Sequence, residues 1–401
     1  MKKNKNSTLL LVLGLMVFLA NGDNYAAASM ISNIAGDLNL TVSTAALSVT
    51  AYMLSFGLFT LIFGPLADRF GKVKVINIAA FGTATFSMLG AMAFNLPSLI
   101  FFRSVNGMFG AAIFPVTIAY VGELFNDKNR HKAIAKVMGL GFLGTASATA
   151  IGGAVAYFGS WRYVYLIYGI GEIVLAMFML RMLERDVPVV KKFSLVSSYK
   201  EALTNTKFMR VVSILFFVGF AVLGSFTFSG IMVKGSTGFN VFIVGLILSI
   251  FGVGTVIGSK VVASVRKKLK HGFLPVAGVL GFLSLLTMAS FNHPVLIAIG
   301  FFGYGIAFIF IQSTIISAAQ ENLPKRKGTA MSMASFNMFV GAAIGTTING
   351  AVLKVYGLRT VFTYSAFLIL FAAIAAAFVL YGLEKKKEKI EELKDEKISR
   401  G

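Results

Sequence analysis

Long apolar stretches separated by short polar segments dominate this 401-residue chain. Each stretch has roughly 20 or more residues and few charges, which is the length that an α-helix needs to cross a bilayer. Most of the polar segments between them are too short to fold as separate domains. The pattern predicts membrane-spanning helices at 8–34, 43–66, 75–94, 98–124, 133–157, 161–182, 211–233, 240–262, 273–291, 295–318, 329–353 and 360–382.

The longest polar segment divides these twelve helices into two sets of six. Very short connections, such as Asn95–Pro97, force neighbouring helices to run antiparallel. We therefore expect an all-α polytopic membrane protein built from two six-helix bundles. The predicted parts are an N-terminal bundle at 1–182, a cytoplasmic linker at 183–210, a C-terminal bundle at 211–383 and a charged tail at 384–401.

The two sets of helices repeat each other in sequence. One shift of 197 residues places GAVAYFGSWRYVY (153–165) over GAVLKVYGLRTVF (350–362), and the same shift pairs Arg162 with Arg359, Gly144 with Gly341, and Arg69 with Arg266. Similarity between apolar helices alone does not account for the matched arginines in loops. The repeat indicates two parallel halves related by a pseudo-twofold axis along the membrane normal.

Positive charge is distributed unequally between the two sides of the predicted bundle. When the loops between the predicted helices are numbered from the N-terminus, all but five of the 37 Lys and Arg lie at the termini or in and beside the even-numbered loops. The exceptions are Arg103, Arg162, Lys234, Lys354 and Arg359. Lys and Arg are retained on the cytoplasmic side of a membrane. We therefore expect both termini in the cytoplasm of a multi-pass protein of a bacterial-type cell membrane.

Composition excludes several classes of function. The net charge of +21 would suggest nucleic acid in a soluble protein, but 57% of residues are hydrophobic and the cations flank membrane spans. The chain has no Cys, its His131, His271 and His293 lack the spacing of metal ligands, and no G-x-x-x-x-G-K-[ST] loop occurs. We expect no enzyme, metal, cofactor or nucleic-acid partner; the expected partners are a small-molecule substrate and the lipid bilayer, and the expected state is a monomer.

The loop after the second predicted helix reads GPLADRFGKVKV. It resembles the signature loop of the major facilitator superfamily, with Gly64, Asp68, Arg69, Gly71 and Lys72 in the expected places. The resemblance implies that this loop gates the cytoplasmic side by latching the two halves together, with Glu123 as its acidic partner. Positive-inside chemistry alone would explain Arg69 and Lys72, but not Asp68 between two ordered glycines.

A positive charge lies inside the fourth predicted helix. The segment RSVNGMFGAAIFP resembles the family's second motif, with Arg103 ahead of a run of small residues and Asn106 where Gln is usual. A charge within the bilayer costs at least about 2.5 kcal/mol and normally has a partner. Arg103 and Asp23 are both predicted about 8 Å below the outer surface. We therefore predict an Asp23–Arg103 ion pair that faces a central cavity, either as part of proton coupling or as a structural pair.

Glu172 is the other acidic residue predicted near the middle of the membrane, in the sixth helix. Desolvation disfavours the charged form of a carboxyl, so such a group is a candidate proton carrier. A cationic substrate would compete with the proton for the same place. The alternative is a local bond to Tyr168 or to a neighbouring helix.

Polar and aromatic residues at suitable depth are candidates for the lining of a substrate cavity. An apolar pocket with few polar anchors would suit an amphipathic ligand. The candidates are Asn21, Asn24, Tyr25, Tyr52, Asn106, Phe217, Phe220, Phe226, Tyr304, Phe308, Gln312, Asn337 and, in addition, Asn349.

Two further segments resemble twelve-span bacterial drug:proton antiporters. In the fifth helix, GTASATAIGG keeps Gly144, Gly152 and Gly153, although Ala148 and Thr149 stand where Gly-Pro is common, and the region 313–345 resembles that of drug and tetracycline exporters. The resemblance implies secondary efflux of a small amphipathic drug or metabolite, with protons as the coupling ion and alternating access as the mechanism. The alternative is a nutrient or metabolite facilitator or importer of the same fold.

Overall fold

The computed structural model describes residues 2–125, 127–184, 186 and 195–399. The first half of the chain forms α1 (Lys2–Asp37), α2 (Val42–Ala45), α3 (Leu47–Phe70), α4 (Lys72–Ala91), α5 (Leu96–Leu124), α6 (Asp127–Phe158) and α7 (Trp161–Met182). The second half forms α9 (Thr206–Val218), η1 (Gly219–Leu223), α10 (Gly224–Phe226), α11 (Ser229–Thr237), α12 (Val241–Leu269), η2 (Lys270–Gly272), α13 (Phe273–Ser290), α14 (Pro294–Asn322), η3 (Pro324–Arg326), α15 (Lys327–Tyr356) and α16 (Leu358–Ser399). Between them lies α8 (Leu195–Thr204).

The helices supply the twelve predicted membrane crossings. Among the described residues, 11 segments are long and apolar enough to cross a bilayer, and the segment Val241–Ser290 contains two helices, α12 and α13, joined by η2. The seventh predicted helix is a single crossing made of α9, η1, α10 and α11. Its π-helical turn begins at Gly219, where an added Cβ would meet the Met338 carbonyl of α15. Close packing between two backbones accompanies this irregular segment.

Side chains at the helix starts explain where several helices begin. Asn95, Asn205 and Asn240 each accept a hydrogen bond from the backbone N–H three residues later, and Ser160 accepts one from Arg162. Such caps satisfy N–H groups that have no partner within the helix. The short polar loops therefore stop one helix and position the next.

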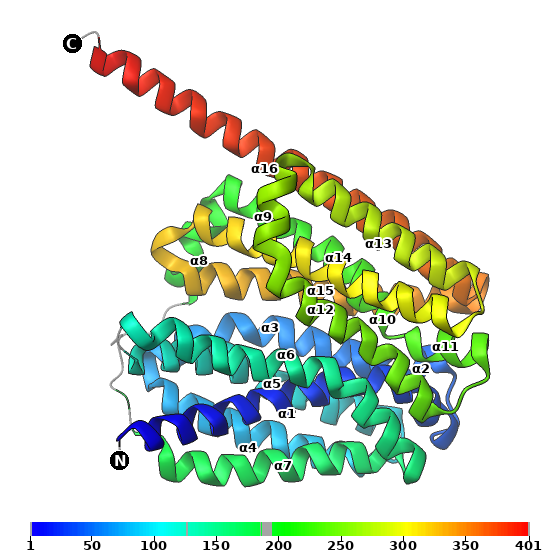
Figure 1. Ribbon diagram of the computed structural model, residues 1–401. Coiled ribbons are helices and arrows are strands. Elements are labelled where there is room, and N and C mark those ends of the chain that lie inside the picture. The colour runs from blue at the N-terminus through cyan, green and yellow to red at the C-terminus, as the bar shows by residue number, and fades with distance from the viewer. Residues whose placement is uncertain (1, 126, 185, 187–194, 400–401) are drawn as a thin grey trace.

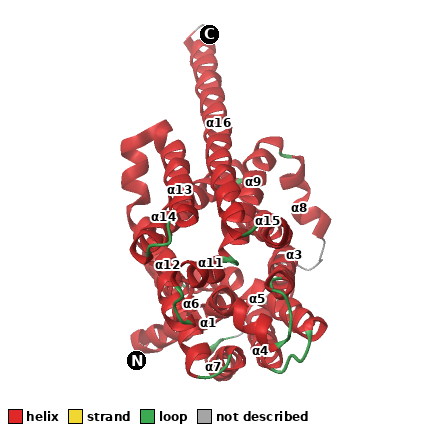
Figure 2. Cartoon of the chain, turned by 90° about the vertical axis from the view of Figure 1, so that its right-hand side faces the viewer, coloured by secondary structure: helices red, strands yellow, loops and turns green. Residues whose placement is uncertain are grey.

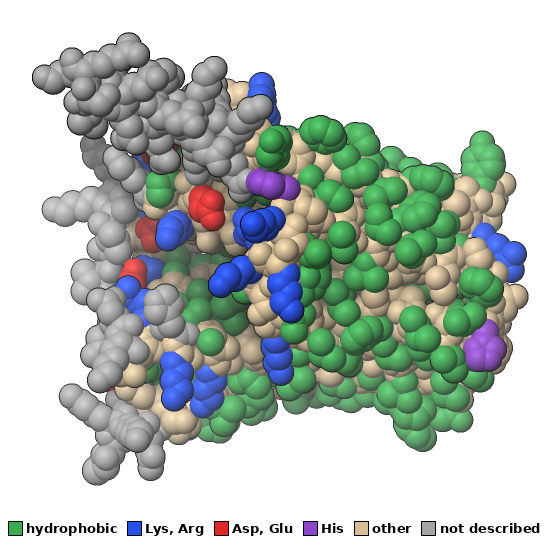
Figure 3. Space-filling model, turned by 45° about the horizontal axis from the view of Figure 1, so that its top comes forward, with side chains coloured by type: hydrophobic (Ala, Val, Ile, Leu, Met, Phe, Trp, Pro, Cys, Tyr) green, Lys and Arg blue, Asp and Glu red, His purple; other side chains and the backbone are tan. Residues whose placement is uncertain are grey.

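Both termini lie at the same end of the molecule, at the left in Figure 1, as an even number of crossings requires. The face in Figure 3 has its Lys and Arg gathered towards that end, whereas hydrophobic side chains cover most of the remainder. A hollow lies on this face close to the cation-rich end. Figure 2 shows the opposite end, with α1 and α4–α7 in one bundle and α9 and α12–α15 in the other.

The predicted repeat is visible in the packing of helices. An added Cβ on Gly144 would meet the Phe18 carbonyl of α1, and one on Gly341 would meet the Phe216 carbonyl of α9. Gly144 and Gly341 are the pair matched by the 197-residue shift. Equivalent glycines thus allow the same close helix contact in each half.

The two halves meet along α3 with α15 and along α6 with α12. Gly153 of α6 lies against the Val241 carbonyl, 2.5 Å from an added Cβ, and Gly245 of α12 lies against Thr149. Near the same end, Gly230 of α11 lies against Ala28 of α1. An added Cβ on Gly139, nearer the cation-rich end of α6, would have nothing within 4 Å. The close backbone contacts between α6 and α12 therefore extend from the end away from the termini to the middle of these helices, where Gly252 lies against Ala146.

The connection between the halves is also packed where it is described. The Tyr199 hydroxyl of α8 donates to the Leu61 carbonyl of α3 at 2.8 Å, and Glu201 accepts from the Arg326 guanidinium at 2.8 Å. Burial raises the pKa of Tyr199 to about 12, so its hydroxyl remains a donor at neutral pH. Through these contacts α8 touches both halves. Residues 185 and 187–194 of the predicted linker lie outside the described part of the chain, as do the side chains of the predicted tail, residues 384–401.

Candidate functional site

The expected ion pair between α1 and α5 is present. Arg103 Nη1 lies 3.1 Å from Asp23 Oδ1, and each side chain is 1% exposed. The direct contact agrees with the equal depths in the membrane that the sequence predicts for the two residues. The structure differs from the prediction in one respect: the pair is enclosed within the N-terminal half and does not face an open cavity.

Aromatic rings explain why the pair is enclosed. The Arg103 guanidinium lies 4.4 Å from the ring centroid of Tyr52 and 4.9 Å from that of Tyr165. Cation–π contacts of this kind stabilise a positive charge that has lost its water. Tyr52 comes from α3 and Tyr165 from α7, so four helices surround the charge.

The amide of Asn106 extends the pair towards α4. Its Oδ1 accepts from Arg103 Nη1 at 3.2 Å, while its Nδ2 donates to the carbonyl of Thr83 at 2.9 Å and to the Thr83 hydroxyl at 3.2 Å. Asn106 is completely buried. An amide at this position holds the guanidinium by its acceptor and α4 by its donor, which explains how Asn serves in place of the usual Gln.

Glu172 of α7 lies beside this network and is completely buried. It is within electrostatic reach of Asp23 and Arg103, and Thr83 lies next to its carboxyl. Within the described residues, neither Glu172 oxygen has a hydrogen-bond partner of good geometry, and the same holds for the Tyr168 hydroxyl and for Oδ2 of Asp23. The local bond to Tyr168 that the sequence left open is therefore not formed, whereas Thr83 of the neighbouring α4 is the polar residue next to the carboxyl. A completely buried carboxyl without a hydrogen-bond partner of good geometry is unusual, because buried polar groups are normally hydrogen-bonded.

Glycines on α5 allow Tyr52 to lie against Arg103. An added Cβ on Gly107 would lie 3.0 Å from the carbonyl carbon and the Cα of Tyr52 and closer still to its carbonyl oxygen, and one on Gly110 would lie 2.9 Å from the Tyr52 hydroxyl. Backbone atoms cannot move aside as flexible side chains do. The small residues of the second motif thus bring α3 and α5 together at the ion pair.

We expect Gly107→Ala to lower the stability of the protein by about 1–3 kcal/mol, because overpacking forces the α3 backbone away. The matched control is Gly139→Ala, since Gly139 is also helical and has open space around it. Thermal unfolding in detergent checks this prediction. Equal unfolding midpoints for the two variants would show that the α3–α5 contact is looser than described.

The gating loop forms its own charged cluster at the cation-rich end. Lys72 Nζ lies 2.9 Å from Glu123 Oε1 and 3.9 Å from Asp68 Oδ1, and the Lys72 side chain is only 3% exposed.

Gly71 of the gating loop has φ +91°, a conformation that favours glycine, and it separates α3 from α4. The Arg69 guanidinium lies over the ring of Phe70. Gly64 faces Ser332 of α15, with 3.7 Å from an added Cβ to Oγ, so this loop borders the other half.

Asp186, just after α7, completes the gating loop from a distance in sequence. Its carboxylate accepts from the backbone N–H of Lys72 at 2.6 Å and of Val73 at 3.0 Å. A negative charge at these first N–H groups stabilises the start of α4. The sequence reasoning missed Asp186, because a contact between positions 114 residues apart leaves no local pattern.

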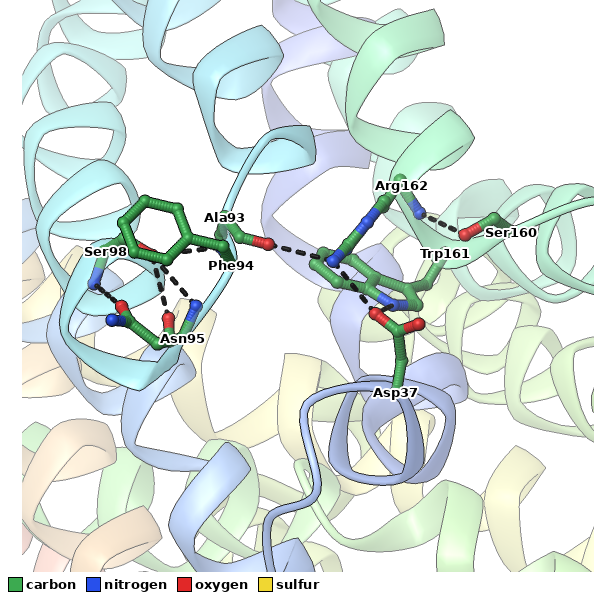
Figure 4. A network of polar contacts seen from close by, with 8 residues as sticks. All are labelled: Asp37, Ala93, Phe94, Asn95, Ser98, Ser160, Trp161 and Arg162. Atoms are coloured by element: carbon green, nitrogen blue, oxygen red, sulfur yellow. Dashed lines mark hydrogen bonds and ion pairs between the residues drawn. The ribbon is translucent and has the colours of Figure 1, made fainter.

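A second polar network closes the opposite end of the N-terminal half (Figure 4). Arg162 Nη2 lies 3.0 Å from Asp37 Oδ2 and 2.9 Å from the Ala93 carbonyl, and Trp161 Nε1 donates to the same carboxylate at 3.2 Å. In the other half Arg359 points to Asn292 at 3.5 Å. Arg162 thus connects the start of α7 to the loop between α4 and α5. Arg359 makes the equivalent connection from the start of α16 to the loop between α13 and α14.

The remaining cavity candidates fall into three groups. Asn21 donates to the Gly141 carbonyl of α6 at 3.0 Å, while Asn24 and Tyr25 lie on α1 beside Asp23. Phe226, Tyr304 and Phe308 pack around Phe251 in the core of the C-terminal half. The other candidates are dispersed over the C-terminal half. Phe217 is 41% exposed beside Phe371, and Phe220 faces Tyr364. Gln312 contacts Met338, Asn337 donates a hydrogen bond within its own helix, and Asn349 is buried with neither polar atom paired among the described residues. None of these hydrogen bonds or ring contacts joins one group to another, and the predicted substrate cavity stays a prediction.

Two residues of the charged site were not predicted, Thr83 and Tyr165. A signal for Tyr165 exists in the sequence, because Tyr165, Tyr168 and Glu172 recur at helical spacing and share the buried face of α7. Thr83 carries no such signal in its own helix.

Comparison with known proteins agrees with this architecture. The chain is 25% identical to the multi-drug resistance efflux pump PmrA of Streptococcus pneumoniae over 86% of its own length and 88% of that protein. It is 24% identical to the multidrug transporter protein MdtP of Bacillus subtilis over 88% of its length and 76% of that protein. The crystal structure of a mutant of the nucleoside transporter NupG superposes with a TM-score of 0.72, at 16% identity, over 92% of this protein and 99% of that one.

The sequence profile of the Major Facilitator Superfamily matches residues 13–346. That region contains the gating loop, the Asp23–Arg103 pair, Glu172 and most of both halves. The chain is therefore a membrane-spanning transporter that belongs to the Major Facilitator Superfamily.

Proposed function

We propose that this transporter exports small amphipathic molecules, cationic ones in particular, in exchange for protons. The observation that carries the proposal is the completely buried Glu172 carboxyl, which has no partner of good hydrogen-bond geometry among the described residues and is in electrostatic reach of Asp23 and Arg103. The multidrug efflux pumps among the relatives support the substrate class.

Charge neutrality explains why such a site would exchange one cation for another. Two carboxylates and one guanidinium, all ionised, have a net charge of −1 in surroundings that exclude water. An uncompensated charge there is costly, so the site favours binding one positive charge. That charge is either a proton on Glu172 or a cationic group of the substrate nearby. The two would compete, and competition of this kind links export to proton entry.

The arrangement of the two halves supports alternating access, in which rocking would open the site that is enclosed in the present conformation. Close backbone contacts between α6 and α12 extend from the end away from the termini to the middle of these helices, and Figure 3 shows a hollow near the cation-rich end. We infer that the cation-rich end is cytoplasmic, because positive residues remain inside. The substrate would then enter from the cytoplasm, and rocking of the two halves would expose it to the outside. The Lys72–Glu123 cluster at the inner edge would move with this transition.

Proteoliposomes with an imposed pH gradient test the proposed function. An acidic lumen is expected to drive accumulation of a cationic dye such as ethidium, and collapsing the gradient with nigericin should release it. Empty liposomes with the same gradient are the control for passive partition. Dye entry that is equal with and without a gradient would contradict proton exchange.

The facilitator alternative has one observation in its favour. Asp23 and Arg103 are paired directly and are 1% exposed, as a purely structural pair would be. Facilitated transport predicts uptake of a metabolite down its own gradient at the same rate in either pH gradient. The dye assay and a parallel nucleoside uptake assay therefore separate the two functions.

A further inference from the structure

A basic pocket opens at the cation-rich end of the C-terminal half, apart from the charged site. Its volume is about 570 Å³. Arg266 and Lys267 come from the end of α12, and Lys270 and His271 from η2. Its other lining residues are Ala263, Phe273, Leu274, Thr314, Ala377, Leu380 and Tyr381.

No lining residue of this pocket is acidic, and the sequence has no Asp or Glu from 202 to 320. The equivalent loop of the N-terminal half differs in this respect. There Lys72 is neutralised by Glu123 and Asp68, and Asp186 binds the start of α4. The repeat matches Arg69 with Arg266, yet only the first loop carries its own acids. The second therefore gathers cations around a hollow, and α12, η2 and α13 contain no acidic residue. Glu321 of α14 is not among the lining residues, and the side chain of Glu384 of α16 lies outside the described part of the chain.

The position of the pocket indicates which anion would fit. Directly along the helices that form it, apolar side chains face outwards: Val276 and Val279 on α13, and Ile374 and Phe378 on α16, are between 38% and 74% exposed. Tyr381 stands at the rim, 49% exposed, with its ring 5.0 Å from that of His271. An aromatic side chain between apolar and charged residues is typical of the membrane interface. The pocket thus has cations on its polar side and continues into the surface that contacts acyl chains.

We propose that this pocket binds the phosphate of an anionic phospholipid headgroup, with the acyl chains along α13 and α16. Basic pockets between transmembrane helices on the cytoplasmic side are suited to such headgroups. Arg266 and Lys267 would contact the phosphate, and Lys270 would lie at the entrance. The apolar floor of Phe273, Leu274 and Leu380 would receive the glycerol region.

Thermal unfolding of the full-length protein in dodecyl maltoside tests this proposal. Dioleoyl-phosphatidylglycerol is expected to raise the unfolding midpoint with saturation, whereas phosphatidylcholine is not. In the double variant Arg266→Gln/Lys267→Gln, the half-saturating lipid concentration should rise at least tenfold. The control is Lys132→Gln/Lys207→Gln, which removes two exposed cations of the same end outside the pocket and should keep the wild-type response.

Three results would overturn the proposal. Equal weakening in both double variants would mean that lipid responds only to overall charge. An unchanged response in Arg266→Gln/Lys267→Gln would remove the pocket from lipid binding. Glycerol 3-phosphate acting at the same concentration as the lipid would identify a site for a soluble phosphate. If the double variant does not fold, Lys270→Gln replaces it, with an expected threefold or greater weakening and the same opposing outcome.

Discussion

Replacing Asp23 by asparagine should abolish gradient-driven transport and destabilise the N-terminal half. Arg103 would remain completely buried without its directly bonded carboxylate, because its other direct contacts are an amide oxygen and two aromatic rings and Glu172 acts on it only through space. Breaking a buried pair on one side typically costs about 3–5 kcal/mol. We expect the unfolding midpoint to fall and dye accumulation in the proteoliposome assay to drop at least a hundredfold.

The control for this variant is Asp37→Asn on the same helix. Asp37 also pairs with an arginine, but it is 47% exposed, and exposed pairs contribute about 0–1 kcal/mol. Its effect should be small. The double variant Asp23→Asn/Arg103→Gln removes both charges and should recover much of the stability while transport stays lost. Full transport by this double variant would show that the pair is structural only.

Glu172→Gln is expected to impair the coupling of dye transport to protons without lowering the stability of the protein. The amide has nearly the same shape as the carboxyl and carries no charge, and the carboxyl has no hydrogen bond of good geometry to lose among the described residues. The unfolding midpoint should therefore stay the same or rise, since a buried unpaired charge is unfavourable. Dye accumulation driven by the pH gradient should fall at least tenfold, and dye exchange without a gradient should persist.

Glu201→Gln is the matched control, because Glu201 is about half exposed and lies outside the membrane in an ion pair with Arg326. It should transport as the wild type does. Gradient-driven accumulation in Glu172→Gln at the control's level would exclude Glu172 as the proton carrier.

The sequence was sufficient for the fold and for the Asp23–Arg103 pair between α1 and α5, but not for the Asp37–Arg162 and Glu201–Arg326 pairs. Span lengths and short loops determine the twelve crossings, and the depth of Asp23 and Arg103 follows from the helical rise of about 1.5 Å per residue. The glycines of α6 were also informative: Gly144 and Gly152 lie against α1, and Gly153 against α12. Each conclusion depends either on the length of a helix or loop or on the size of a residue, and both can be read directly from a sequence.

The rotation of each helix about its axis was much harder to predict. A helix that is apolar all round has no amphipathic face to identify its interior. For this reason Phe217, predicted to line a cavity, is 41% exposed beside Phe371, whereas Tyr165, which was not singled out, lies over Arg103. Asp186 was missed for a different reason, since its contact with α4 depends on how the polypeptide returns after α7. Polar residues with fixed depth were therefore more predictable than aromatic ones.

Proton release on substrate binding is the most direct test of the central claim that the Asp23–Arg103–Glu172 site binds one positive charge, a proton or a substrate cation, in addition to that of Arg103. Ethidium is added to detergent-solubilised protein in weakly buffered solution, and the released protons are measured with a pH indicator. The account predicts about one proton per bound dye for the wild type and none for Glu172→Gln. Dye binding to the wild type without proton release, or equal release from Glu172→Gln, would contradict it.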